Sequence, residues 1–154
     1  MISAAEVRDI EDLLRIEDAC FHCDRLTRRQ FRHLLTRANA ATVVAREAGR
    51  ASGYATVLFR DGSPRARLYS TGVAPERRGE GLGRALLRAA EAAARRRGAA
   101  WMRLEVRPDN CAAVDLYRSA GYEAFGRYAG YYEDESDALR MEKALNPARK
   151  GKRR

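Results

Sequence analysis

Residues 77–98, RRGEGLGRALLRAAEAAARRRG, place three glycines at alternate positions directly before a long run of helix-forming residues. The first amide groups of a helix have no partner inside it, and the helix dipole gives them partial positive charge. Gly79, Gly81 and Gly83 have no Cβ atom, so an anion can approach the main chain and the turn can adopt positive φ angles. Arg77 and Arg78 add side-chain charge. The pattern therefore indicates a phosphate-sized anion site, although a tight strand-to-helix turn without a ligand also favours glycine.

Two better-known phosphate motifs do not fit this segment. A Walker A loop requires Gly-Lys-Ser/Thr, which is missing from the sequence. A dinucleotide-binding motif would be followed by a parallel strand with an acidic residue at its end, placed to bind a ribose, and no such strand follows. The glycines therefore indicate an anion site of another kind.

The sequence RRGEGLGRALL resembles the acetyl-coenzyme A signature R-x-x-G-x-G of the GNAT superfamily of N-acetyltransferases, with Arg78, Gly81 and Gly83 in the signature positions. The preceding STGVAPE and the following LEVRPDNCAAVDLYRSAGYEAFGRYAGYY are similar to the same family in order and spacing, so the resemblance covers about residues 40–145. It implies an acyltransferase that uses acetyl-coenzyme A as co-substrate. The implied fold is α+β, with a central mixed, mostly antiparallel sheet flanked by helices.

The resemblance also implies a set of cofactor contacts. Val73, at the end of its strand, would offer backbone groups to the pantetheine and acetyl ends of the cofactor, while residues 78–84 would surround the pyrophosphate. Asn110 matches the family's asparagine beside the pantetheine arm, and Tyr117 matches its tyrosine near the cofactor sulfur. The cofactor-binding residues expected in this way are Thr71, Val73, Arg78, Gly79, Gly81, Leu82, Gly83, Arg84, Asn110 and Tyr117.

The segment from Glu105 to Tyr132 is most similar to the bacterial ribosomal-protein N-terminal alanine acetyltransferases, which share LEVR-x-x-N followed by LY-x-x-x-GY/F. That similarity implies that Glu105 is the general base and Tyr117 the general acid. The first forty residues depart from this subgroup, because CFHCDRLTRRQF replaces its usual Pro-Trp-Ser start to the second helix. We therefore expect a primary amine as acceptor, with a protein or peptide N-terminal α-amine favoured, but no particular ribosomal substrate.

The chemistry of acetyl transfer supports this choice of acceptor. The amine must be neutral to attack, and the departing thiolate needs a proton. At pH 7 an α-amino group with a pKa of about 7.7–8.0 is roughly 10–20% neutral, whereas a lysine with a pKa of about 10.4 is less than about 0.1% neutral. Both proposed catalytic residues have simpler interpretations: Glu105 can be a surface carboxylate paired with Arg103 or Arg107, and Tyr117 a packed tyrosine with a satisfied hydroxyl.

The segment YAGYYEDESDAL, residues 128–139, combines tyrosines with acidic residues. Tyr131 and Tyr132 stand beside Glu133, Asp134, Glu135 and Asp137, and such a group can form an acceptor pocket that attracts a cationic amine. A solvated acidic hairpin explains the same residues, and the sequence leaves both interpretations open.

The elements that position these residues follow from hydrophobic spacing and turn residues. Asp9 with Asp12 can start a helix with Ile10, Leu13, Leu14 and Ile16 on its apolar face, and Thr27 with Gln30 has the spacing of a capping box. Two further helices are predicted from Leu82 to Arg97, closed by Gly98, and from Asn110 to Gly121. Strands are predicted at 5–9, 41–46, 51–60, 65–73, 100–106, 122–132 and 137–145.

Length and composition limit what surrounds this site. At 154 residues we predict one N-acetyltransferase domain, residues 1–145, followed by a basic and disordered tail, residues 146–154. No apolar run approaches the roughly 18–20 residues that cross a bilayer, and the start lacks the order of a secretory signal, so we expect a cytoplasmic protein without membrane contact. Three cysteines with a lone C-x-x-C predict neither a disulfide framework nor a zinc site, and no metal is expected.

The formal net charge is +9, and the tail residues Arg149, Lys150, Lys152, Arg153 and Arg154 contribute five of these charges, which leaves four for the rest. The tail can therefore contact RNA or a ribosome weakly, or it can be a solvated end. Two other functions stay open: an acetyltransferase for small-molecule amines, and a catalytically silent acetyl-coenzyme A-binding or RNA-associated module.

Overall fold

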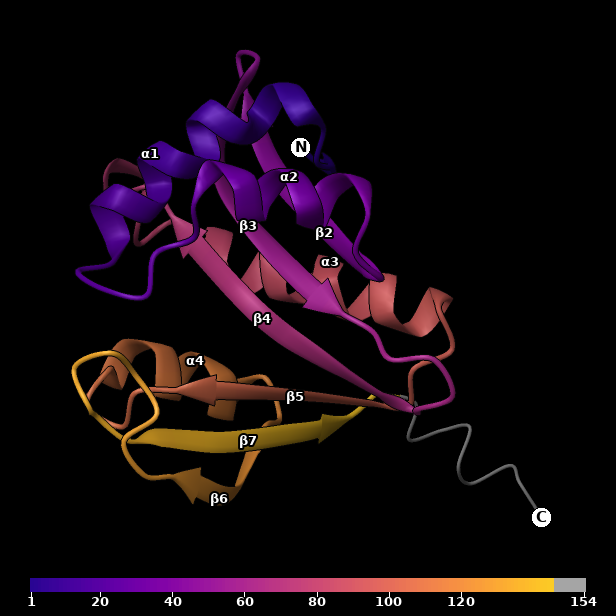
Figure 1. Ribbon diagram of the computed structural model, residues 1–154, viewed down its shortest axis with the longest axis vertical. Helices are drawn as coiled ribbons and strands as arrows, with labels where there is room; N and C mark the ends of the chain where they lie inside the picture. The colour runs from indigo at the N-terminus through magenta and orange to yellow at the C-terminus, as the bar shows by residue number, and fades with distance from the viewer. Residues whose placement is uncertain (146–154) are drawn as a thin grey trace.

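The computed structural model describes residues 1–145, which form one seven-stranded sheet in the order β1-β2-β3-β4-β5-β7-β6, with helices on both faces (Figure 1). The strands are β1 (Ile2–Ala4), β2 (Ala40–Glu47), β3 (Arg50–Leu58), β4 (Arg65–Val73), β5 (Trp101–Val106), β6 (Glu123–Tyr128) and β7 (Ala138–Ala144). The helices are α1 (Ile10–Cys20), α2 (Arg28–Thr36), α3 (Leu82–Arg96) and α4 (Cys111–Ser119), with 3₁₀ turns η1 (Val7–Asp9) and η2 (Pro75–Arg77). The tail, residues 146–154, lies outside the described residues.

The predicted α+β class and mixed, mostly antiparallel sheet are confirmed, because every neighbouring pair of strands is antiparallel except β4 with β5. The strand predicted at residues 5–9 is wrong. That segment contains η1, held by a reciprocal capping box between Glu6 and Asp9, and the first strand is Ile2–Ala4. The local hydrogen bonds that these two carboxylates accept from main-chain amides outweigh the alternation of apolar and polar residues that suggested a strand.

The helix ends follow the sequence signals in three of four cases. Thr27 and Gln30 form the predicted capping box, and the Asn110 side chain accepts a hydrogen bond from the Ala113 amide. Gly98 has a φ of +86° just after α3, as expected of a glycine that ends a helix. Asp9 precedes α1 but does not cap it, because its carboxylate accepts the Glu6 amide and is ion-paired with Arg46.

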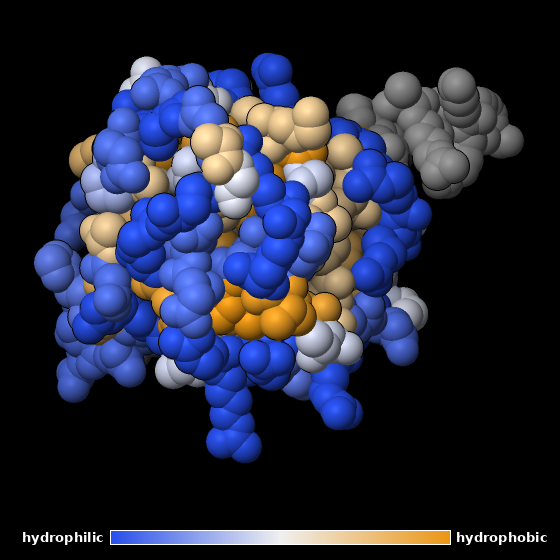
Figure 2. Space-filling view, turned by 90° about the horizontal axis from the view of Figure 1, so that it is seen from above, coloured by the Kyte–Doolittle hydropathy of each residue, from blue (hydrophilic) through white to orange (hydrophobic). Residues whose placement is uncertain are grey.

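The two faces of the sheet are covered differently. One face carries a hydrophobic cluster to which both α3 and α4 contribute, while a second cluster joins α1 and α2 to the opposite face around β2 and β3. Figure 1 shows α1 and α2 over the upper half of the sheet, whereas β5, β7 and β6 have no helix in front of them. Seen from above, the outer surface is mainly hydrophilic, with smaller hydrophobic areas between charged side chains (Figure 2). We call the uncovered part of the sheet the open face.

Strands β4 and β5 separate partway along their length. Their parallel pairing runs from Arg65 opposite Trp101 to Leu68 opposite Leu104, and then stops. Beyond that point β4 pairs only with β3, as far as Val73, and β5 pairs only with β7, as far as Val106. The divergence is visible in Figure 1 and leaves the inner edges of both strands available to a ligand.

The α1–β3 contact includes a buried carboxylate that the sequence pattern did not reveal. Glu17 is 2% exposed and accepts hydrogen bonds from the Leu26 amide and the Tyr54 hydroxyl. Burial raises the pKa of Glu17, because desolvation disfavours its charged form more than these hydrogen bonds favour it. No helix within residues 1–145 is long and apolar enough to cross a membrane.

Candidate active site

The turn before α3 has the properties expected of an anion site. Gly81 is the N-cap residue of α3, with a φ of +81°, and no side chain caps this helix. The amides of residues 81–84 donate no hydrogen bond to another residue within 1–145. A Cβ atom built on Gly79 or Gly81 would meet nothing within 4 Å. Several polarised N–H groups therefore face open space beside bare main chain.

The two arginines before this turn have different surroundings. Arg78 is exposed, and its Nη2 lies 3.2 Å from the Cys20 thiol, with no carboxylate partner among the described residues. Arg77 instead forms ion pairs with Glu47 and Glu80. The expectation that both arginines supply charge to the site is thus corrected, because Arg77 is held by two carboxylates and Arg78 alone remains uncompensated.

Other residues expected around the cofactor lie between β4, α3 and α4. A Cβ on Gly83 would contact Leu116 at 3.6 Å and Val73 at 4.0 Å, so this glycine lies close to the end of β4. The Val73 carbonyl accepts a hydrogen bond from Cys20 at 3.3 Å. The Thr71 hydroxyl donates to a main-chain carbonyl of β3, which leaves it engaged within the sheet. Leu82 packs against the cluster on the α3 face, and the Arg84 guanidinium donates to the Ser119 hydroxyl.

Glu105 lies near the end of β5, where its side chain projects to the open face and is only 9% exposed. Its Oε1 atom accepts a hydrogen bond from Arg67 Nε at 2.8 Å and lies 2.8 Å from Arg67 Nη2 in the same ion pair, while Oε2 accepts no hydrogen bond from the described residues. Arg103 and Arg107, the partners considered from sequence, pair with other carboxylates. The Glu105 carboxylate is therefore fixed at one oxygen and free at the other.

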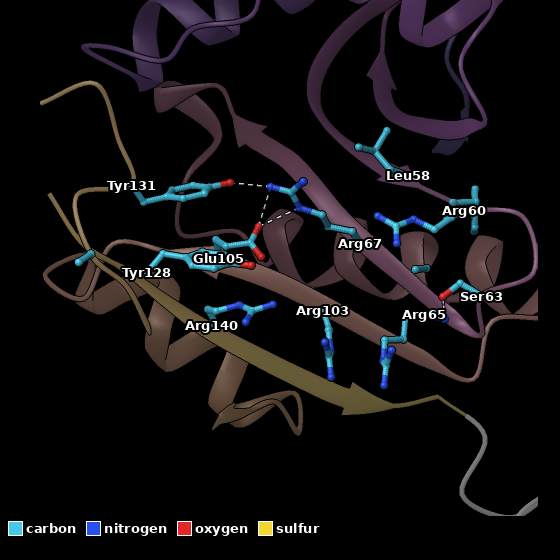
Figure 3. Close-up of a pocket in the computed structure, with 13 residues that line it drawn as sticks. Leu58, Arg60, Ser63, Arg65, Arg67, Arg103, Glu105, Tyr128, Tyr131 and Arg140 are labelled. Atoms are coloured by element: carbon cyan, nitrogen blue, oxygen red, sulfur yellow. Dashed lines mark hydrogen bonds and ion pairs between the residues drawn. The ribbon is translucent and has the colours of Figure 1, made fainter. Parts of the chain in front are cut away.

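Arg67 also connects Glu105 to the loop between β6 and β7. The Tyr131 hydroxyl accepts from Arg67 Nη2 at 2.6 Å, and the Tyr131 ring is stacked on Tyr128 with centroids 5.4 Å apart (Figure 3). Burial disfavours the charged guanidinium, but the Glu105 carboxylate and Tyr131 outweigh it and raise the pKa of Arg67. Burial likewise raises the pKa of Tyr131.

These residues belong to a pocket of about 680 Å³ on the open face. Its lining comprises Leu58, Phe59, Arg60, Ser63, Arg65, Ala66, Arg67, Arg103, Glu105, Tyr128, Ala129, Tyr131 and Arg140. Tyr132 is not part of the lining; its ring packs 4.1 Å from the Arg107 guanidinium, and burial raises its pKa to about 12. Tyr131 and Tyr132 thus have different surroundings, although they are adjacent in sequence.

The acidic residues that follow Tyr132 do not line this pocket. Glu133 accepts the main-chain amide of Asp24 at 2.8 Å, and Asp134 pairs with Arg107 at 2.9 Å. Asp137 accepts the Gly130 amide and pairs with an arginine of β6. These carboxylates hold the loop in place, and the attraction of a cationic amine by this acidic group stays a prediction.

One group of potential metal ligands occurs within residues 1–145. Donor atoms of Cys23, Asp24 and Glu133 lie within 4.8 Å of one another. The cysteine donates to Asp24, which raises the pKa of the thiol, and Arg107 approaches both Cys23 and Asp24. The group therefore already has a network of hydrogen bonds among its own members and one arginine.

Tyr117 lies on the other side of the sheet from Glu105. It is 6% exposed and packs in the cluster that contains Leu104 and Val106, the two neighbours of Glu105 that point away from the open face. Its hydroxyl makes no hydrogen bond within residues 1–145, so the interpretation as a packed tyrosine with a satisfied hydroxyl does not describe it. Burial raises the pKa of Tyr117 to about 12.

The arrangement defines a chemical capability. The gap between β4 and β5 connects the open face, with the Glu105 carboxylate, to the face where α4 holds the Tyr117 hydroxyl and α3 presents free amides. A proton acceptor, a proton donor and an anion site thus surround one opening. Sequence reasoning missed Arg67 and the other pocket arginines, because the arginine-rich composition hides them and only strand register brings them together.

Comparison with known proteins shows the family of this chain. A family model described as Acetyltransferase (GNAT) family matches residues 8–122. A Bacillus subtilis protein, described as a putative ribosomal protein bS18-alanine N-acetyltransferase, is 32% identical over 91% of this chain and 92% of its own length. The crystal structure of the ribosomal-protein-S18-alanine N-acetyltransferase from Escherichia coli superposes with a TM-score of 0.83, at 28% identity, covering 94% of this chain and 93% of that one.

Some relatives match over a smaller part. The mycothiol acetyltransferase of Nocardiopsis dassonvillei is 42% identical over 80 residues, which are 52% of this chain but 24% of that protein. This chain therefore spans only about a quarter of the length of that relative.

Proposed function

Because this chain belongs to the GNAT acetyltransferase family, we propose that it transfers the acetyl group of acetyl-coenzyme A to the N-terminal α-amine of a protein or peptide, by direct attack of the amine. Family membership makes the chain an N-acetyltransferase, which argues against a catalytically silent module. The co-substrate, the acceptor and the roles of individual residues are the substance of the proposal.

The residues present fit a coenzyme A pyrophosphate. The amides of residues 81–84 and the uncompensated Arg78 would hold its oxygens, and the bare main chain at Gly79 and Gly81 leaves room for it. The unpaired edge of β4 up to Val73, together with Asn110 at the start of α4, would contact the pantetheine arm. When bound, acetyl-coenzyme A would supply an acetyl group activated as a thioester.

Glu105 would remove the proton from the acceptor amine. Its Oε1 atom is held by a hydrogen bond and an ion pair with Arg67, which orients the carboxylate, and its Oε2 atom is free to accept a proton. The Tyr131 hydroxyl accepts a hydrogen bond from the same guanidinium.

Tyr117 would supply the proton that the departing thiolate needs. With a pKa raised to about 12 by burial, this hydroxyl stays protonated at every physiological pH. It has no partner within residues 1–145, so its proton is available to an incoming group. The observation that carries the proposal is the separation of β4 from β5, which opens the sheet between Glu105 and Tyr117.

The cofactor claim is tested with two matched glycine variants. Gly81 and Gly49 have φ angles of +81° and +80°, and a Cβ on either would meet nothing within 4 Å. Gly81→Val and Gly49→Val should therefore strain the chain equally, by about 1–2 kcal/mol or more. We expect calorimetric titration with acetyl-coenzyme A to show weakened binding only for Gly81→Val. Equal affinities for both variants would contradict the assignment of the pyrophosphate site.

The acceptor claim is tested with synthetic peptides. We expect release of coenzyme A with peptides that have a free N-terminus and no lysine, and none with their N-terminally blocked counterparts that contain lysine. Mass spectrometry of the products would locate the added acetyl group. The match to a mycothiol acetyltransferase supports a second candidate, an acetyltransferase of small-molecule amines, and turnover of small amines without turnover of any peptide would favour it.

A further inference from the structure

The pocket on the open face is strongly basic. Five of its lining residues are arginines, and the only acidic lining residue is Glu105. We call the set Arg60, Arg65, Arg67, Arg103 and Arg140 the arginine groove. In Figure 3, Glu105 and Tyr131 lie at one end of this groove, and Arg60, Ser63 and Arg65 lie at the other.

Most of this charge has no compensating carboxylate. Arg67 and Arg103 are ion-paired, with Glu105 and with a glutamate of β7. Arg60, Arg65 and Arg140 have no ion pair with any residue in the part of the chain that the structure describes. Three guanidinium groups in one groove are therefore left for an external anion.

Arg140 gives the clearest sign of a missing partner. Its Nε atom is buried and makes no hydrogen bond, and it is the one such side-chain atom among residues 1–145. The guanidinium lies 4.2 Å from the Tyr128 ring and 4.7 Å from the Phe125 ring, which hold it in place without satisfying its N–H groups. Leaving a buried donor unsatisfied is costly, so this geometry points to an acceptor atom supplied from outside.

Strand register explains how these charges come together. Arg67 lies opposite Arg103 in the parallel pairing of β4 with β5, and Arg140 lies opposite Glu105 in the pairing of β5 with β7. The first of these pairs places two like charges directly opposite each other, which destabilises a sheet. A departure of this kind from the rules of sheet stability is typical of functional sites.

The dimensions of the groove match an extended peptide. Arg65 lies opposite Trp101, four residues along β5 from Glu105, which corresponds to about 13 Å at roughly 3.3 Å per residue. An extended peptide that places its amine at Glu105 would reach the level of Arg103 with its third residue and the level of Arg65 with its fifth.

Resting on the proposed function, we propose that the acceptors of this enzyme are peptide N-termini whose third to fifth residues are aspartate or glutamate. Their carboxylates would bind the arginine groove, with Arg65 and Arg60 as the contacts at the far end and Arg140, whose backbone lies opposite Glu105, as the contact at the near end. A peptide fits better than a nucleic acid, because the same molecule must bring a primary amine to Glu105.

The test compares three peptides that begin with two alanines and continue with three glutamates, three glutamines or three lysines. Coenzyme A release would be measured at about 20 mM and about 500 mM salt. At low salt we expect kcat/KM for the glutamate peptide to exceed that for glutamine by about tenfold and that for lysine by more, with the difference shrinking at high salt.

Groove variants locate the effect. Arg65→Gln, an exposed position, and Arg140→Gln should each reduce the glutamate preference about threefold or more, and Arg65→Glu should shift preference toward the lysine peptide. Arg88→Gln serves as the control. Arg88 is exposed on α3 and has no ion pair among residues 1–145, and its substitution removes the same charge as the groove variants. We expect this control to keep the wild-type preference.

Each outcome has one meaning. Equal turnover of all three peptides would overturn the acidic preference and leave the proposed function intact, whereas acetylation of none would overturn both. A third outcome is that a short RNA inhibits the enzyme, that Arg65→Glu abolishes this inhibition, and that no glutamate preference is seen. The ligand of the groove would then be a nucleic acid and not an acidic peptide. If both Arg65→Gln and Arg140→Gln kept the wild-type preference for the glutamate peptide, another surface would bind the carboxylates, and the groove assignment would be wrong.

Discussion

Replacing Glu105 with glutamine tests the proton path most directly, because the amide keeps the shape of the side chain and removes only its basicity. The amide oxygen can still accept from Arg67, whose Nε donates to Oε1 at 2.8 Å. The loss of charge assistance should therefore cost about 1 kcal/mol of stability. A general base contributes about 10²–10⁴-fold to turnover, which corresponds to roughly 2.7–5.4 kcal/mol in the barrier. The catalytic effect should clearly exceed the structural one.

The pH dependence of Glu105→Gln distinguishes the type of acceptor. Without a base, turnover should follow the neutral fraction of the amine. Between pH 7 and pH 9 that fraction rises about 6- to 10-fold for an α-amine and about 100-fold for a lysine. With a neutral peptide acceptor, we therefore expect the wild-type to variant ratio of kcat/KM to narrow by up to about tenfold over this range.

Glu142 provides a matched control for this experiment. It lies on β7, pairs with Arg103 at 2.9 Å and is not part of the pocket lining. Glu142→Gln removes the same charge and breaks a similar ion pair, so turnover of the neutral peptide should stay within about twofold. If Glu105→Gln retained activity within about threefold of wild type at pH 7, the assignment of Glu105 as general base would be refuted.

Three other outcomes are expected. Tyr117→Phe should lower turnover by about 10²–10⁴-fold. It should not lower the melting temperature, because the lost hydroxyl has no partner within residues 1–145. Wild-type turnover should show no decline from tyrosine ionisation up to about pH 11, since burial raises the pKa of Tyr117 to about 12. Removal of residues 146–154 with the buried Leu145 retained should leave turnover of short peptides within about twofold, and any effect should be confined to large anionic partners and disappear at high salt. Glu17→Gln should melt at a higher temperature than wild type near pH 7 but not near pH 4, because a carboxyl group whose pKa is raised on folding loses its stabilising contribution as pH rises through that pKa.

Local signals were enough to predict the elements that carry the site. Strand β4 matches its predicted range of 65–73, and α3 begins at Leu82 as expected, because turn glycines and hydrophobic spacing determine both from neighbouring residues. The prediction of a first strand at residues 5–9 was wrong for a local reason, because the capping box of η1 occupies that segment. The reciprocal box of Thr27 with Gln30 shows the same chemistry where it was recognised.

Partners that are distant in the chain could not be predicted. Glu133 accepts a hydrogen bond from the main-chain amide of Asp24, 109 residues away, so this part of the acidic segment holds two loops together. Glu105 pairs with Arg67 because β4 and β5 run parallel in one particular register, which no local pattern specifies. The alternation of apolar and polar residues along a strand predicts which side chains share a face of the sheet, but it does not predict which strand is the neighbour.

The basic groove and the base act on the same amine in compatible ways. Nearby positive charge disfavours an ammonium ion, so the guanidinium groups of Arg140 and Arg67 on either side of Glu105 should lower the pKa of a bound α-amine and raise its neutral fraction. An acceptor whose first residues were all cationic would meet this repulsion without compensation. Carboxylates at the third to fifth positions would offset it at the far end of the groove, while the amine at Glu105 still feels the charge that favours its neutral form. On the proposed function, one set of arginines would therefore both select an acidic peptide and activate its amine.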